Sequence, residues 1–280
     1  LFFTLRGSVL PRIAPTLATC TGVALAVSLT HGFLFHWKVT LTPVPFSLIG
    51  LALAFFLGFR NSAAYERFWE ARRLWGDVIH RSRTLARQVL CLVAPPAPAA
   101  AAQEDRRVRM VRRTIAYAHA LRHQLRDTRA TDDVAKWLTP EDRLRFERAR
   151  LGTECLLRQN AVDLASWLHA GDLPAPIAAE IDRSLAALAA AQAGCERIKS
   201  TPIPFAYTLL LHRTAYIYCF LLPFGLIDVT GFMTPFVVAI VAYTFFGLDA
   251  VGDEIEHPFG TNAQHLPLEP LCRVIEADLL

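Results

Sequence analysis

The sequence predicts an all-helical membrane protein, and three observations support this. Hydrophobic residues make up 53% of the 280 residues and the mean hydropathy is +0.31, whereas apolar residues with glycine included are roughly half of a soluble globular protein. The apolar residues gather towards both ends of the chain and the charged residues towards its middle. Apolar residues recur at helical spacing, and no strand-like alternation persists. This layout is typical of a membrane protein with a large helical domain outside the bilayer.

The first predicted span covers residues 13–37, which contain no Asp, Glu, Lys or Arg. Arg12 and Lys38 flank this stretch, and Trp37 is expected at the membrane interface, where amphipathic aromatic side chains collect. About 20 apolar residues in a helix match the thickness of the hydrocarbon core. We therefore predict a first transmembrane helix here.

The second predicted span covers residues 41–59, nineteen residues without a charge. Pro43 and Pro45 suit the first turn of a helix, where a missing backbone N–H costs little. Arg60 marks the end of the uncharged stretch, but the helical pattern continues to residue 92 and becomes amphipathic. The sequence therefore predicts one helix that crosses the membrane and extends beyond it.

The middle of the chain is predicted to be helical and to lie outside the membrane. A run of proline and alanine at residues 94–103 ends the long helix. Thr139 followed by Pro140 and two acids is a helix start with a cap, a first-turn proline and favourable charges. Another helix is predicted from about residue 176 to residue 193.

The last third of the chain contains two further predicted spans. Residues 200–227 are apolar except for His212 and Arg213, and ionisable groups at that depth must face protein or water. The segment therefore enters the membrane only after Arg213, or these two side chains line an aqueous vestibule. Asp228 is predicted to mark a short turn, and residues 229–248 are a fourth, uncharged span.

These elements divide the chain into four segments: residues 1–92, 93–200, 201–248 and 249–280. Arginines crowd the loop after the second span and precede the first span, whereas the loop near Asp228 has none. Positive charge marks the cytoplasmic side of a membrane protein. We therefore predict four crossings, with both termini and the helical domain in the cytoplasm.

Composition and motifs argue against several classes of function. The net charge of +4 is modest, and the arginines are interleaved with acids as on solvated helix faces, so no nucleic-acid partner is expected. The six cysteines form no CxxC pair, which argues against a zinc site or a disulfide framework. The sequence contains no glycine-rich phosphate loop and no GxSxG motif, and no enzyme activity is predicted.

Two groups of residues could hold a metal ion, but another interpretation is favoured for each. His119 and His123 stand at i, i+4 and could share a metal, although two histidines without a third ligand are more often surface or packed residues. Four acids follow the last span and could bind a hard cation: Asp249, Asp253, Glu254 and Glu256. Pairing of these acids with arginines of the long helix is favoured, so no metal or cofactor is predicted.

Three residues of the second span recur at i, i+4 and i+8: Leu51, Phe55 and Phe59. This spacing places them on one face of the helix, and we call them the neck stripe. On its own, an aromatic stripe of this kind is more often a packing face than the wall of a pore.

Several long motifs resemble those of the bestrophin family, most closely its bacterial branch. They are FxLGFRNSAxYxRxxEARxLWG at residues 55–76, TPIPFAYTLLLHRTAY at 201–216 and DEIEHPFG at 253–260. The blocks have the order and spacing of that family, and the similarity extends from RGSVLPRI near the start to LPLEPLCRVIEADLL at the end. It therefore covers nearly the whole chain.

The resemblance implies a five-fold symmetric ion channel in which the second membrane helices surround a narrow hydrophobic neck. The family's neck positions fall on Leu51, Phe55 and Phe59, and a ring of such side chains blocks ions by dewetting until it widens. Leucine at the outermost position departs from the β-branched residue common in the family. The resemblance thus favours a pore over a packing face.

A second constriction, at the cytosolic aperture, is implied for the helix after GDLPAPI. Comparison with bacterial members points to Pro176 and the pattern of animal members points to Ile177, and both remain open. Animal members also bind calcium through acids just after a PFG motif. Here PFG at residues 258–260 is followed by no acid until Glu269, which argues against calcium gating.

The sign of the permeant ion stays open. The dipole at the start of the second helix would favour anions, whereas rings of acids near the inner mouth would favour cations. Animal bestrophins conduct chloride, and some bacterial members prefer monovalent cations. The gating stimulus and the physiological role are not predicted.

The resulting expectation is a homopentamer in the bacterial inner membrane that passes small monovalent ions, either chloride or Na⁺/K⁺. Two alternatives belong to other classes. A membrane-bound metal-dependent enzyme would use His119, His123 and the acids around Glu254, and a non-conducting membrane scaffold would use the neck stripe only for packing.

Overall fold

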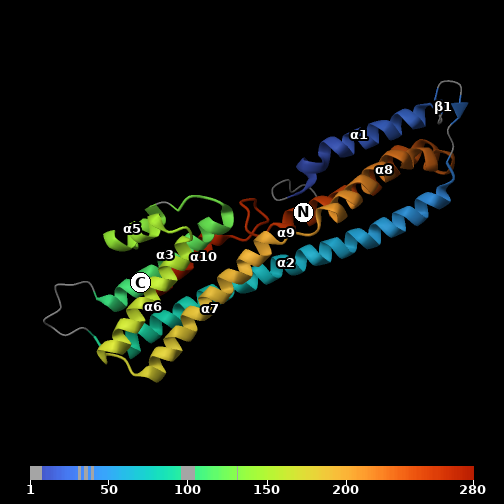
Figure 1. The fold of residues 1–280 in the computed structure, drawn as a ribbon. Coiled ribbons are helices and arrows are strands. Elements are labelled where there is room, and N and C mark those ends of the chain that lie inside the picture. Colours follow the sequence, from blue (N-terminus) through green and yellow to red (C-terminus); the bar gives the residue numbers. More distant parts are fainter. Residues whose placement is uncertain (1–7, 31–32, 35–36, 39–40, 96–104, 131) are drawn as a thin grey trace. The chain divides into compact units, whose positions relative to one another are not determined.

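The structure is a computed structural model that describes residues 8–30, 33–34, 37–38, 41–95, 105–130 and 132–280. The chain divides into two compact units (Figure 1). The first unit comprises residues 1–68, 202–258 and 262–265, and the second comprises residues 69–201, 259–261 and 266–280. The long helix α2 contributes residues to both units.

The first unit is built from apolar helices that pack side by side (Figure 1). Its elements are α1 (Leu10–Leu29), the hairpin strands β1 (Phe33–Leu34) and β2 (Trp37–Lys38), the first part of α2 (Pro43–Leu92), α8 (Phe205–Thr230), the 3₁₀ turn η2 (Gly231–Met233) and α9 (Thr234–Glu256). Within the described residues, three helical stretches are long and apolar enough to cross a membrane: Leu10–Leu29, Pro43–Leu92 and the contiguous Phe205–Glu256.

Helix α1 is shorter than the sequence predicts. It ends at Leu29, where the backbone N–H and the hydroxyl of Thr30 both bond to the carbonyl oxygen of Ala26. The predicted continuation to residue 37 is therefore wrong, and Trp37 belongs to the antiparallel hairpin in which it pairs with Leu34. A helix whose last carbonyl groups are capped by a threonine ends there despite the apolar residues that follow.

The turn between the last two apolar helices also differs from its predicted place. It lies at residues 231–233 and not at Asp228. Gly231 has φ +54°, a left-handed conformation that favours glycine. The Thr234 hydroxyl donates to the Gly231 carbonyl oxygen at 2.6 Å. Helix α8 begins only at Phe205, after Pro204, and not at residue 200.

Helix α2 confirms the prediction of one uninterrupted helix that leaves the uncharged stretch and continues through the arginine-rich one. Its side chains Leu53, Leu57, Arg60 and Ala64 are buried. These four share one face of the helix, because they recur at spacings of three and four residues. This face packs into the core of the first unit, where Leu53 and Leu57 join residues of α1, α8 and α9.

Within its described residues, all elements of the second unit are helices, as predicted. It contains the second part of α2, α3 (Arg106–Arg126), α4 (Asp132–Ala135), α5 (Pro140–Arg148), α6 (Gly152–Ala170), α7 (Ala175–Ser200) and α10 (Leu268–Leu279). The predicted start at Thr139 is confirmed, because its side chain accepts a hydrogen bond from the Asp142 N–H at 3.2 Å. Helix α7 extends seven residues beyond its predicted end at residue 193.

A buried ion network ties three helices of this unit together. The Arg113 guanidinium on α3 donates to both oxygens of Asp142 on α5, at 2.7 and 2.8 Å. It also donates to Asp163 on α6 at 2.5 Å, and Arg109 contacts the same carboxylate at 3.1 Å. The Arg113 side chain is only 2% exposed. A bidentate pair in such a site leaves little unsatisfied charge.

We predict that Arg113→Ala strongly destabilises the second unit. The substitution leaves the buried Asp142 carboxylate without its cation and removes one of the two arginines that contact Asp163, and breaking a buried pair in this way costs about 3–5 kcal/mol. The measurement is the melting temperature of the purified protein in detergent. The control is Arg143→Ala, which removes an exposed i, i+4 pair with Glu147 and should leave the melting temperature nearly unchanged. Equal melting temperatures for the two variants would contradict the prediction.

Candidate functional site

The neck stripe lies on the exposed face of α2. Leu51, Phe55 and Phe59 are 58%, 60% and 65% exposed. Together with Ala54, Gly58 and Ser62 they line a shallow apolar groove along the helix. The side chains of α2 that are buried in the first unit lie on the opposite face of the helix, half a turn away. The stripe therefore takes no part in the core of the first unit.

The end of the uncharged stretch is anchored by Arg60, whose side chain is fully buried. Its Nη1 atom lies 2.7 Å from Asp249 Oδ1, and Nη2 lies 3.6 Å from Glu256 Oε2 and also contacts Asp253. The three carboxylates are spaced along α9 at four and three residues and so share one side of that helix. This confirms, for three of the four acids after the last span, the prediction that they pair with an arginine of the long helix.

Further contacts extend this network within the first unit. His212 Nδ1 lies 2.7 Å from Asp249 Oδ2, and Arg12 lies 3.0 Å from Asp253 Oδ2. The Asn61 amide donates to the Leu248 carbonyl oxygen at 3.0 Å, and Arg67 donates to the Glu256 carbonyl oxygen at 2.8 Å. His212 thus has a protein carboxylate as its partner, as a polar group in an apolar helix requires.

The sequence alone does not assign Arg60 and His212 to these partners. The available signal was the spacing of the three acids, which places them on one side of α9. Spacing alone does not show which helix lies beside that side. Only the packed structure pairs the two helices.

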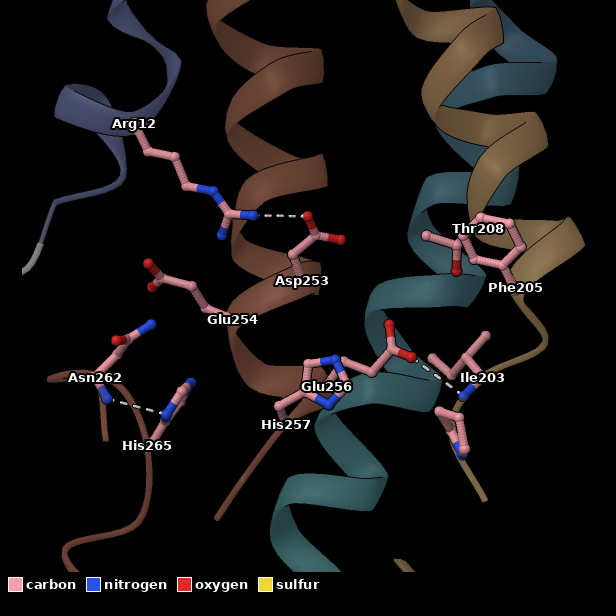
Figure 2. A pocket seen from close by; sticks show the side chains of 11 residues that line it. Arg12, Ile203, Phe205, Thr208, Asp253, Glu254, Glu256, His257, Asn262 and His265 are labelled. Atoms are coloured by element: carbon pink, nitrogen blue, oxygen red, sulfur yellow. Dashed lines mark hydrogen bonds and ion pairs between the residues drawn. The ribbon is translucent and has the colours of Figure 1, made fainter. Parts of the chain in front are cut away.

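A cavity of about 630 Å³ lies at the end of α9 (Figure 2). Two of its acids are engaged: Asp253 pairs with Arg12, and Glu256 accepts a hydrogen bond from the Ile203 N–H at 3.1 Å. Glu254 extends from α9 into the same cavity (Figure 2). The segment after the PFG motif contributes Asn262 and His265, which are joined by a hydrogen bond of 3.1 Å. The segment after the PFG motif thus contributes an amide and an imidazole group to the cavity lining.

The two candidates for the cytosolic aperture lie in the first turn of α7. Pro176 is exposed and Ile177 is half-buried, and the Ile177 N–H donates to the Pro174 carbonyl oxygen at 3.0 Å. The choice between them stays a prediction.

His119 and His123 lie in a cluster of charged side chains in the second unit. His119 Nε2 is 2.5 Å from Glu276 Oε1, and His123 Nε2 is 3.0 Å from Asp133 Oδ2. Arg122 also contacts Asp133, so a cation already occupies that carboxylate. Within the described ranges, no group of three or more His, Cys, Asp or Glu side chains could hold a metal ion.

Burial determines the protonation of His119, which is 3% exposed. Desolvation lowers the pKa of its imidazole below the ordinary value of 6.5, although Glu276 and Asp133 oppose this shift. The folded protein therefore favours the neutral ring, whereas the unfolded chain binds a proton more readily.

The pH dependence of stability follows from this shift. The contribution of neutral His119 is fully present above pH 6.5 and decreases as the pH falls below that value. We therefore predict that the decline in melting temperature between pH 7 and pH 5 is shallower in His119→Gln than in the wild type. The matched variant His169→Gln changes an exposed histidine and should keep the wild-type decline. A decline equally steep in both variants would refute the assignment.

Two glycines of α9 allow a test of the packing around Arg60. A Cβ atom on Gly252 would overlap Asn61 Oδ1 and lie 3.4 Å from Arg60 Nη1, whereas a Cβ on Gly247 meets nothing within 4 Å. Alanine is a better helix former than glycine by about 1 kcal/mol. We expect Gly252→Ala to lower the melting temperature and Gly247→Ala to keep or raise it. The opposite ranking would show that α2 and α9 do not approach each other as described.

Comparison with known proteins identifies relatives of the whole chain. A family model described as Bacterial/Fungal Bestrophin protein matches residues 1–280. The voltage-dependent anion channel-forming protein mll4386 of Mesorhizobium japonicum is 45% identical over 99% of this chain and 86% of its own length. The voltage-dependent anion channel-forming protein YneE of Escherichia coli K12 is 39% identical over 99% of this chain and 89% of its own length.

Solved structures agree with these relatives. A variant of a bacterial bestrophin homologue from Klebsiella pneumoniae superposes with a TM-score of 0.89 and is 39% identical, covering 96% of this chain and 98% of its own. Another crystal structure of that homologue, phased with zinc, gives a TM-score of 0.88 at the same identity and covers 96% of this chain and 97% of its own. The sequence motifs, the helical fold and these matches lead to one conclusion: the chain belongs to the bestrophin family, in its bacterial and fungal branch.

Proposed function

We propose that this protein is a homopentameric ion channel that conducts small monovalent ions passively across the bacterial inner membrane. The observation that carries this proposal is the exposed neck stripe. Three large apolar side chains at successive turns of α2 point away from the core of their own subunit. In a membrane such a face meets lipid, a partner or an enclosed axis, and the match of these three residues to the family's neck positions favours an axis enclosed by five copies.

Ring symmetry is needed because one helix cannot enclose a pore. Identical subunits joined by head-to-tail contacts form a closed ring when the rotation between neighbours closes. The α2 helices then surround the axis with three apolar rings. A narrow apolar constriction expels water and blocks ions until it widens, so the stripe acts as the gate.

The membrane arrangement that fits this proposal has four crossings per subunit: α1, the first part of α2, α8 and α9. A helix of 20 residues is about 30 Å long, which equals the hydrocarbon thickness. The hairpin after α1 and the turn at Gly231 then lie on one side. The arginine-rich second unit and both termini lie in the cytoplasm, following the positive-inside rule. The first turn of α7, with Pro176 and Ile177, would form the cytosolic aperture.

The relatives support conduction as the function. Those from Mesorhizobium japonicum and Escherichia coli are named voltage-dependent anion channel-forming proteins, and this favours anions such as chloride among the permeant ions here. A bond-making reaction is not part of the proposal. The channel needs only the bilayer, its own copies and the ions.

The test removes the neck and keeps the rest of the subunit. In a variant with Leu51, Phe55 and Phe59 all changed to Ala, the constriction is wider and wetter, so ion flux should rise. The measurement is ion efflux from vesicles that contain the purified protein. The control changes Leu210, Ile217 and Leu221 of α8 to Ala, three apolar residues that are also exposed on one helix face. Both variants should remain pentameric by native mass spectrometry.

Two results would refute the proposal. One is unchanged flux in the neck variant when the protein is present as a pentamer. The other is a wild-type protein that is monomeric in mild detergent and produces no ion leak in vesicles.

A further inference from the structure

We propose that Glu66 forms a ring of carboxylates on the inner side of the neck, and that this ring raises the permeability of cations relative to anions. The inference rests on the proposed function, because a ring exists only if the neck stripes surround an axis. Under this inference, Glu66 carries the first charge that an ion meets after it passes the neck.

The position of Glu66 follows from the helix. It is seven residues beyond Phe59 in α2, which is two turns and about 10 Å of rise, so it returns to nearly the same face. Ser62, one turn after Phe59, lines the same groove as the neck stripe. Both Ser62 and Glu66 are exposed. The face therefore changes from apolar to hydroxyl to carboxylate as α2 leaves the neck.

The nearby positive charges of α2 are turned away from this face. Arg60 is fully buried against the carboxylates of α9, and Arg67 is partly buried and donates to the Glu256 carbonyl oxygen at 2.8 Å. Glu66 has no ion-pair partner among the residues of its unit that the structure describes. Within this unit, Glu66 is therefore the first charged side chain on the stripe's face after the neck.

The physical effect of this placement is large because five copies act together. In a ring, five carboxylates concentrate cations and repel anions at the inner mouth of the constriction, as acidic rings do in cation channels. The field extends over a Debye length, about 10 Å at 0.1 M salt and 3 Å at 1 M. A carboxylate on a face that met only lipid would be strongly unfavourable, whereas an aqueous inner mouth solvates it.

The experiment measures reversal potentials of the full-length channel in planar bilayers under asymmetric KCl. Glu66→Gln keeps the size of the side chain and removes the charge, so the ratio of chloride to potassium permeability should rise severalfold. Glu66→Asp keeps the charge and should restore the wild-type ratio. The difference between Glu66→Gln and the wild type should be greatest near 0.01 M salt and shrink near 1 M, because salt screens the ring.

The matched control is Glu70→Gln, one turn further along α2. Glu70 already pairs with Arg197 at 2.5 Å, so its substitution should change the ratio little. Arg73 lies seven residues beyond Glu66 and carries the opposite charge. If the Arg73 side chain also reaches the axis, Arg73→Gln should lower the ratio of chloride to potassium permeability.

An unchanged ratio in Glu66→Gln, or a change that is insensitive to salt, would overturn the inference. It would also be overturned if Arg73→Gln moved the ratio and Glu66→Gln did not. The neck variant separates these outcomes from failure of the proposed function: if its flux rises while Glu66→Gln has no effect, the pore stands and the role of Glu66 does not.

Discussion

The ion pairs of Arg60 constrain the rest of the first unit. A guanidinium with no solvent exposure must keep its carboxylates, because an unpaired buried charge costs several kcal/mol. Asp249, Asp253 and Glu256 satisfy it from α9, and so α2 is held to α9 in one rotational setting. That setting turns Leu53 and Leu57 inward and the neck stripe outward. The apolar face proposed to line the pore thus depends on a polar contact on the opposite side of the same helix.

Because of this contact, the two faces of α2 carry different kinds of side chain. Towards the core, the helix presents small and aliphatic residues together with Arg60, whose two terminal nitrogens are paired with carboxylates. Away from the core, it presents aromatic side chains, then Ser62 and then Glu66. Gate and charge selection are therefore proposed to lie on one rigid element, which positions functional side chains better than a loop would. In the second unit, too, a buried arginine is paired with carboxylates: Arg113 contacts both Asp142 and Asp163.

Much of the architecture could be predicted from local pattern. The continuous helix from Pro43 to Leu92, the capped start at Thr139 and the pairing of three of the four acids after the last span are confirmed. The errors lie at element ends, where local capping competes with an apolar pattern that continues. Helix α1 ends at Leu29, beside Thr30, eight residues before its predicted end. The final turn begins at Gly231, three residues after its predicted position. Hydropathy does not report such caps, because they depend on single side-chain bonds.

By itself, the sequence determined the helical class, the apolar segments, the spacing of the neck stripe and the family. These properties depend on local composition, on periodicity or on motif order, all of which can be read along one chain. Only the tertiary structure decided which face of α2 is buried, which arginine meets which acid and that the face shared by the neck stripe and Glu66 stays exposed. The physical reason is that a helix has several candidate faces, and only packing against its neighbours removes one of them from solvent.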